Sequence, residues 1–217
     1  MKIISVNVGG PREVEWHGRR VRTSIWKTPV EGRVLVRGHN LEGDQQSDLR
    51  VHGGPDKAVY AYPHEHYDDW RRERPELSFP RGAFGENLTT EGLLEGELRI
   101  GDHLRVGSAE FRVSEPRMPC YKLGVRFGRD DMVKLFLESG RSGFYLAVVK
   151  EGEVGAGDAV SFTSRADHPV TVADVATLLG RDAEDPDLLR RVLAAPALPE
   201  SLRDHFRERL RESFASR

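Results

Sequence analysis

Short apolar runs separated by glycine turns fill about the first 165 residues, and this pattern limits the fold more than any other feature. The run Lys2–Val8 is rich in β-branched residues and ends at two glycines and a proline. Residues 13–16 and 20–26 flank a turn at His17-Gly18, and further strands are predicted at residues 34–36, 58–62, 104–106, 110–113, 144–149 and 159–163. Many short strands with frequent glycines favour a β-barrel or sandwich over a parallel α/β sheet. The predicted fold class is mainly β, with a few helices.

Two helices interrupt the predicted strands. One covers residues 64–74, between two prolines, and the other covers Asp131–Ser139 and stops at Gly140. The only cysteine, Cys120, is expected in a loop between the strand at 110–113 and the second helix. Loops that connect regular elements often carry functional residues.

The pattern changes from strands to helices near residue 166. Thr171 and Asp174 resemble a capping box at the start of a short helix, and Asp185 precedes a proline at the start of a second helix. A third helix is predicted after Pro199, with an apolar stripe at i, i+4 spacing. We therefore predict two domains, a β-barrel domain over residues 1–166 and a three-helix domain over residues 167–217.

The composition indicates an ordinary water-soluble protein. Among 217 residues, 38% are hydrophobic and 31% are charged, and the formal net charge is −2. A charge this small does not attract nucleic acid or an anionic membrane, and the arginines of the last helix alternate with acidic residues. The apolar stretch at residues 1–6 is too short to predict a secretory signal, no apolar run is long enough to predict a membrane span, and one cysteine predicts no disulfide framework. These features predict a cytoplasmic location.

Cys120 is the residue in which chemistry is most expected. Arg117 and Lys122 lie close to it in the sequence, and nearby positive charge favours the thiolate. Three interpretations stay open from the residues alone: a small buried side chain, a metal ligand, or a nucleophile with His52 as its base. A zinc site is disfavoured because no second cysteine or pair of spaced histidines accompanies Cys120.

Other residues of interest are glycine turns and isolated cations. Gly53 and Gly54 follow His52, and such glycines let a backbone approach a ligand closely. Asn87, in a second glycine turn, offers an amide suited to the edge of a heterocycle. Three cations, Lys27, Lys57 and Arg141, are candidates to bind a phosphate. Each of these features also has a purely structural explanation, as a tight turn or a solvated charge.

Taken in order, these segments resemble one family. The carriers are Ile25-Trp26-Lys27-Thr28-Pro29-Val30, Gly43-Asp44, Asp48-Leu49-Arg50-Val51-His52-Gly53-Gly54-Pro55-Asp56-Lys57, Gly85-Glu86-Asn87-Leu88, Arg117-Met118-Pro119-Cys120-Tyr121-Lys122-Leu123 and Arg141-Ser142-Gly143-Phe144-Tyr145. Together they look like a MOSC domain of the YiiM type. The helices after residue 166 look like the three-helix appendage of that type, so the resemblance covers essentially the whole chain.

The resemblance implies a β-barrel that binds the molybdenum cofactor, a molybdopterin, with Cys120 as the metal ligand. Cofactor-binding residues carried over or proposed on this basis are Lys27, Thr28, Gly53, Gly54, Lys57, Asn87, Arg117 and Arg141. Within that set, Lys57, Arg117 and Arg141 are the candidate phosphate anchors.

The implied activity is the reduction of N-hydroxylated compounds such as 6-hydroxylaminopurine, with His52 as the proton donor. The chain has no cysteine cluster for an iron–sulfur centre and no dinucleotide fingerprint, so a separate reductase is expected to supply electrons. A homodimer is possible, and neither nucleic acid nor membrane is an expected partner. The alternative function is sulfur transfer through a persulfide on Cys120.

Overall fold

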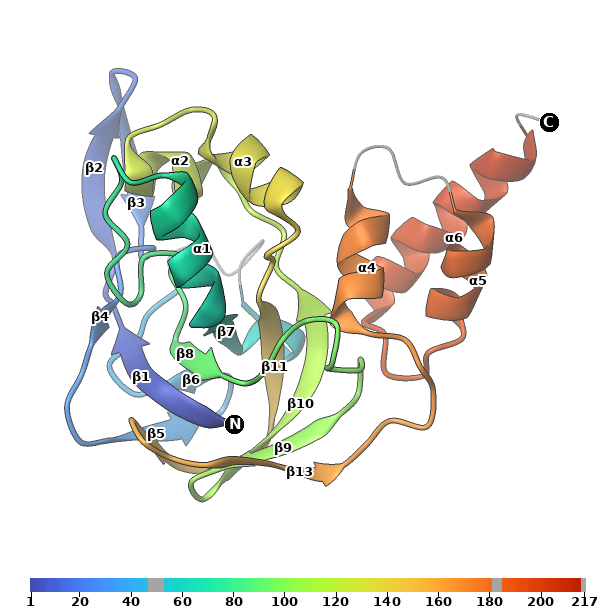
Figure 1. The fold of residues 1–217 in the computed structure, drawn as a ribbon, viewed down its shortest axis with the longest axis horizontal. Coiled ribbons are helices and arrows are strands. Elements are labelled where there is room, and N and C mark those ends of the chain that lie inside the picture. Colours follow the sequence, from blue (N-terminus) through green and yellow to red (C-terminus); the bar gives the residue numbers. More distant parts are fainter. Residues whose placement is uncertain (47–52, 181–184, 216–217) are drawn as a thin grey trace.

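A curved eight-stranded sheet forms the centre of the computed structural model, which describes residues 1–46, 53–180 and 185–215 (Figure 1). The strand order is β13-β9-β10-β11-β7-β8-β1-β4, and all neighbours are antiparallel except the parallel pair β7 and β8. The strands are β1 (Lys2–Val8), β4 (Thr28–Pro29), β7 (Val59–Pro63), β8 (Leu88–Glu91), β9 (His103–Val106), β10 (Ala109–Pro116), β11 (Phe144–Lys150) and β13 (Val160–Ser164). The mainly β fold class with added helices is confirmed.

The closed barrel predicted from the sequence is wrong, because the sheet keeps two edges. An isolated bridge between Lys2 and Ala159 brings β1 close to the start of β13, and the Ile3 amide donates to the Asp158 carbonyl at 2.9 Å. These contacts do not extend into a continuous ladder in the described part of the chain. At the other edge, β4 has only two residues and ends at Pro29, which lacks the N–H needed to continue a ladder.

Two smaller sheets lie beside the main one. The first has the order β12-β5-β6, formed by β5 (Arg33–Arg37), β6 (Asn40–Leu41) and β12 (Gly152–Gly155). The second is the hairpin of β2 (Arg12–Trp16) and β3 (Arg19–Thr23). Its turn is at His17-Gly18, where both φ angles are positive, as predicted for a tight hairpin. Figure 1 shows the hairpin extending past the end of the sheet, on the side of α2.

Three α-helices and a short 3-10 helix occur between the strands of the main sheet. They are α1 (Glu65–Glu73), α2 (Tyr121–Phe127), α3 (Met132–Ser139) and η1 (Pro55–Lys57). An aromatic core joins α1 and α3 to β7. In this core the rings of Tyr62 and Phe84 stack with their centroids 4.4 Å apart, and the Trp70 indole N–H donates to the Tyr62 hydroxyl at 2.8 Å. The sequence predicted α1 and α3 but missed α2, which begins directly after Cys120.

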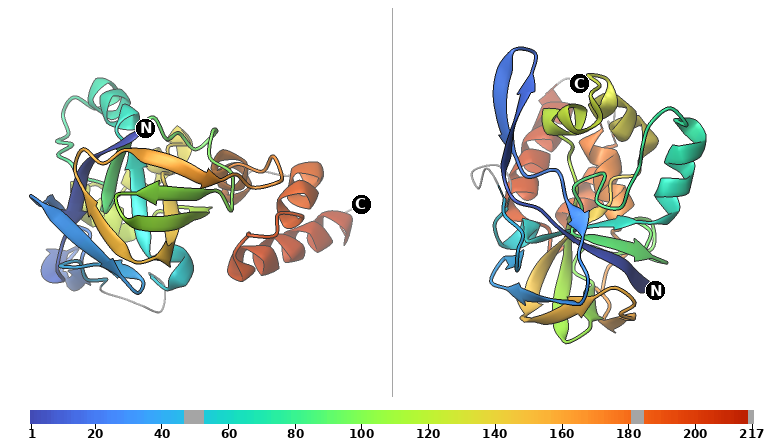
Figure 2. Two further views of the ribbon diagram at one scale, coloured as in Figure 1. Left: turned by 90° about the horizontal axis from the view of Figure 1, so that it is seen from below. Right: turned by 90° about the vertical axis from the view of Figure 1, so that its left-hand side faces the viewer.

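The C-terminal region consists of α4 (Val172–Leu179), α5 (Pro186–Leu193) and α6 (Glu200–Ala215). Thr171 and Asp174 form the predicted capping box, with reciprocal bonds of 3.1 and 2.9 Å, and Asp185 caps α5. Figures 1 and 2 show the three helices grouped to one side of the sheet, with α4 nearest to β10. Apolar residues of α4 belong to the same buried cluster as the sheet interior, and the domain boundary near residue 166 stays a prediction. None of the helices in the described residues combines the length and apolar character needed to span a lipid bilayer.

Candidate functional site

A cleft next to Cys120 brings together most of the site residues expected from the sequence. The volume of the cleft is about 90 Å³. The walls come from the segment after β3, the loop before residue 47, η1, β7, the turn before β8, β11 and the segment after β10. The expected residues that line the cleft are Lys27, Gly53, Lys57, Asn87, Arg117 and Cys120.

Cys120 is half-buried and lies on the wall of this cleft. It directly precedes α2, in an extended conformation that carries the chain from the end of β10 into the helix. Tyr60 and Tyr145 line the cleft with it, and their ring centroids lie 5.2 Å apart. Cys120 is therefore not enclosed in the core, as a small apolar side chain that only fills space would be.

Arg117 is a buried cation on the same wall. Its guanidinium donates to the Phe84 carbonyl and lies over the Tyr60 ring, 4.7 Å from the centroid. Burial opposes the charge, but the neighbouring Tyr60, Tyr145 and Cys120 together raise the pKa of Arg117 above its ordinary value. Arg117 has no carboxylate partner among the described residues. It therefore contributes uncompensated positive charge beside Cys120.

Lys27 and Asn87 meet at a buried carboxylate, Asp44. The Lys27 ammonium donates to Asp44 Oδ2 at 2.6 Å, and the Asn87 amide donates to the same oxygen at 3.0 Å. The side-chain oxygen of Asn87, Oδ1, accepts a hydrogen bond from the backbone N–H of Tyr60 at 3.1 Å. Burial lowers the pKa of Lys27, and Asp44 opposes that effect. Both residues form part of the cleft wall, and a direct contact between either one and a ligand stays a prediction.

The glycine turn before η1 has the backbone geometry that the sequence suggested. Gly53 has φ +108° and Gly54 has φ +87°, values that side chains rarely allow. Gly53 lines the cleft, while Gly54 precedes the first residue of η1. Lys57, the last residue of η1, also lines the cleft, and its ammonium lies 3.2 Å from Glu115 Oε1. His52, the expected proton donor, lies outside the described residues.

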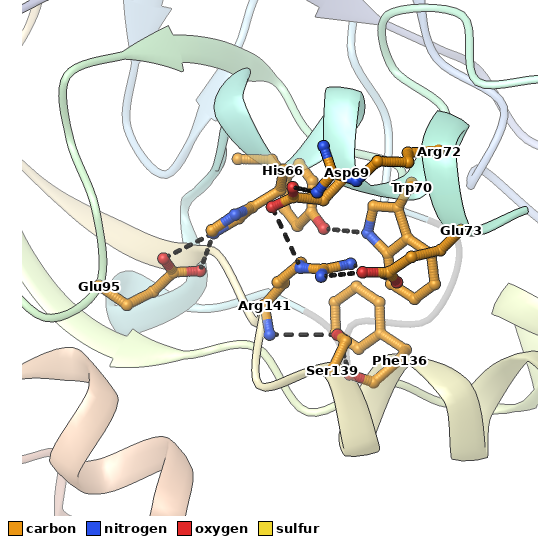
Figure 3. A network of polar contacts seen from close by, with 10 residues as sticks. His66, Asp69, Trp70, Arg72, Glu73, Glu95, Phe136, Ser139 and Arg141 are labelled. Carbon is orange, nitrogen blue, oxygen red and sulfur yellow. Dashed lines mark hydrogen bonds and ion pairs between the residues drawn. The ribbon is translucent and has the colours of Figure 1, made fainter.

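Two expected residues lie away from the cleft. Thr28 is exposed in β4, paired with Val8, and does not line the cleft. Arg141 points toward α1, as Figure 3 shows, where it donates to Glu73 at 2.9 Å and lies 3.6 Å from Asp69. The structure therefore does not place Arg141 among the cations that surround Cys120.

Sequence reasoning did not single out several residues that line the cleft. They are Thr23, Ser24, Ile25, Gln45, Gln46, Tyr60, Gly85, Lys122 and Tyr145. Lys122 is close to Cys120 in the sequence, but that position alone does not indicate that it lines a cleft. Tyr60 and Tyr145 look like ordinary strand residues, and they meet only because β7 pairs with β11. Lys122, like Arg117, has no carboxylate partner in the described part of the chain.

Comparison with known proteins identifies the class to which this fold and cleft belong. Residues 48–161 match the MOSC domain family, and residues 170–212 match the YiiM-like, 3-alpha helix domain family. The chain therefore belongs to the MOSC domain family and carries the YiiM-like helical domain.

The similarity to YiiM proteins extends over most of the chain. Protein YiiM of Escherichia coli is 40% identical over 181 residues, which are 82% of this chain and 80% of YiiM. The crystal structure of YiiM from Geobacillus stearothermophilus superimposes with a TM-score of 0.79 at 34% identity, over 96% of this chain and 98% of that one. A protein of Gibberella moniliformis named reductase is 32% identical over 199 residues, which are 90% of this chain but 35% of that protein.

Proposed function

We propose that the chain is a molybdenum-cofactor-dependent oxidoreductase that reduces N-hydroxylated compounds such as 6-hydroxylaminopurine. The observation that carries the proposal is the position of the only cysteine on the wall of a cleft, next to two cations without carboxylate partners among the described residues. Membership of the MOSC domain family and similarity to a fungal protein named reductase support it.

The residues of the cleft fit a molybdopterin cofactor. A thiolate is a soft ligand that suits molybdenum bound by sulfur, and Cys120 offers one. Arg117 and Lys122 would attract the anionic phosphate of the cofactor, since their charges are not neutralised by carboxylates of the described residues. Tyr60 and Tyr145 add aromatic surface against which a heterocycle can pack. When bound, the cofactor would supply two electrons.

The overall reaction defines what this chain has to contribute. A hydroxylamino group, R–NH–OH, takes up two electrons and two protons, its N–O bond breaks, and R–NH₂ and water are released. The chain binds the anionic cofactor, orients a planar substrate and supplies at least one proton at the departing oxygen. Electrons would come from a separate reductase. The fungal relative is compatible with such a division, because the region similar to this chain is only 35% of that protein.

Molybdenum and pterin content provides the direct test. Wild type and Cys120→Ala would be purified from a host that makes the cofactor, and reduction of 6-hydroxylaminopurine would be followed with a chemical electron donor. We expect molybdenum and activity in wild type and the loss of both in Cys120→Ala. Wild type without molybdenum, together with an unchanged rate in the variant, would contradict the proposal. A sulfur-sized mass increase on Cys120 after exposure to a cysteine desulfurase, in protein without molybdenum, would instead support sulfur transfer.

A further inference from the structure

Glu115 is a buried carboxylate behind the cleft that none of the roles described so far uses. It lies on β10 and is only 2% exposed. Its Oε1 lies 3.2 Å from the Lys57 ammonium and has no well-directed hydrogen bond to any described residue. Removing a carboxylate from water is costly, and burial raises the pKa of Glu115, with Lys57 opposing that effect. Such groups are enriched at functional sites.

Lys57 connects this buried acid to the cleft. It is the last residue of η1, which packs against β10 and β11, and Gln46 donates to its carbonyl at 3.3 Å. The Lys57 side chain is 36% exposed and lines the same cleft as Cys120. Lys57 therefore contacts Glu115 through its ammonium and also forms part of the cleft wall.

The other charged and titratable groups around the pair come from the two strands packed against η1 and from the cleft wall. Asp56, next to Lys57 in η1, is held by Arg112 of β10 at 2.9 Å. Tyr145 of β11 also lines the cleft. Burial raises the pKa of Tyr145 most, Arg117 lowers it, and Glu115 raises it. Asp56 is thus engaged elsewhere, so Glu115 is the carboxylate that contacts the Lys57 ammonium in the described residues.

We propose that Lys57 is the proton donor of the cleft and that Glu115 is its positioning residue. This inference rests on the proposed function. As two electrons enter the N–O bond of the substrate, the Lys57 ammonium transfers a proton to the departing oxygen, which leaves as water, and water at the exposed side of Lys57 returns the proton. The second proton, on nitrogen, comes from solvent. Glu115 holds the ammonium in place through the 3.2 Å contact between the two side chains.

Three variants of the pair and two matched controls test the proposal in full-length protein. The variants are Lys57→Met, which keeps the length of the side chain, Glu115→Gln, and Glu115→Asp as the conservative rescue. Lys2 and Glu91 form a second Lys–Glu contact of 3.2 Å that is solvent-exposed and outside the cleft, so Lys2→Met and Glu91→Gln serve as controls. Molybdenum content, and kcat and KM with a chemical electron donor, would be measured for every variant.

We expect Lys57→Met to lower kcat by about 100-fold or more at unchanged molybdenum content, the lower range for loss of a general acid. Glu115→Gln should lower kcat much more than it changes KM, because the carboxylate that holds the Lys57 ammonium in place is gone. Glu115→Asp should restore part of kcat. The two control variants should leave kcat and KM as in wild type.

Several outcomes would overturn the proposal. A fully active Lys57→Met enzyme would exclude Lys57 as the donor, and loss of molybdenum in that variant would make Lys57 a cofactor anchor instead. An unchanged kcat in folded Glu115→Gln would remove the positioning role, and if that variant does not fold, Lys57→Met still decides the donor. Molybdenum-loaded wild type that fails to reduce N-hydroxylated compounds would overturn the proposed function, and the proton role with it.

Discussion

Arg117 and Arg141 lie in two regions that handle the same side chain in opposite ways. Arg141 sits in a network with α1, where Glu73 and Asp69 balance its charge (Figure 3). Arg117 lies in the cleft against a carbonyl oxygen and the Tyr60 ring, without a carboxylate partner among the described residues. Both arginines were candidate phosphate anchors in the sequence.

The difference shows that charge compensation, and not residue type, separates a structural cation from a candidate anchor. An arginine already paired with acids has little field left to attract an anion. A buried arginine without such a partner keeps its field, which the lower dielectric of the surroundings strengthens. Substitutions in the two regions should therefore have different effects on cofactor retention.

The largest expected effect is on the cleft, through its metal ligand. Cys120→Ser should lower molybdenum retention by more than about 100-fold, since loss of outer-shell groups alone costs 10–100-fold in metal affinity. Elemental analysis of folded protein, matched by circular dichroism to wild type, measures this. Full molybdenum content in the variant would remove the basis for treating the cleft as a metal site.

The expected difference between the two arginines in cofactor retention can be tested directly. Arg117→Gln should weaken cofactor retention by about 10–100-fold, which corresponds to roughly 1.5–3 kcal/mol for a hydrogen bond to a charged group. Arg141→Gln should leave cofactor retention as in wild type. Pterin content after dialysis of the two variants side by side provides the measurement. Equal losses would show that charge compensation by Glu73 does not govern the role of Arg141.

The Arg141 network should matter for stability only slightly. Arg141→Gln is expected to lower the free energy of unfolding by about 1 kcal/mol or less, because Glu73 is partly solvent-exposed and surface ion pairs are weak. Urea unfolding at low and high salt measures this, and the effect should shrink as salt screens the pair. A loss that is large and independent of salt would show that Arg141 acts through packing on Trp70 instead.

The smallest expected effect concerns how the free energy of unfolding depends on pH, because two carboxylates contribute with opposite signs. The hydrogen bond from Arg141 lowers the pKa of Glu73, so its stabilisation is present above the unfolded-state value and is lost as pH falls through the folded value. Burial raises the pKa of Glu115, so its contribution is present at low pH and is lost as pH rises through the folded value. Unfolding of Glu73→Gln and Glu115→Gln across the acidic range should give opposite slopes relative to wild type. Slopes of the same sign would contradict this assignment.

Local signals explain what the sequence predicted about the fold. Glycine turns, helix caps and apolar periodicity act over a few residues, so they placed most of the longer strands, α1, α3 and the capping box at Thr171, while the short strands β6 and β12 were missed. The seven-residue helix α2 was missed because Gly124 and Val125 have low helix propensity, and burial of Leu123 in the aromatic core compensates. The barrel was wrong because closure depends on pairing between the two ends of a sheet, which no local pattern specifies.

The properties of the site likewise divide into those that local sequence determines and those that tertiary structure determines. The sequence by itself determined that Cys120 carries the only thiol, flanked by cations, and that glycines shape the turn at Gly53, because residue identity and backbone freedom are local properties. Only the tertiary structure decided which cation is available to an anion. Arg141 meets its acids on α1 and Lys57 meets Glu115 on β10, while Arg117 meets none in the described residues. Electrostatic pairing depends on distance in space, so segments far apart in the chain decide which charges are neutralised.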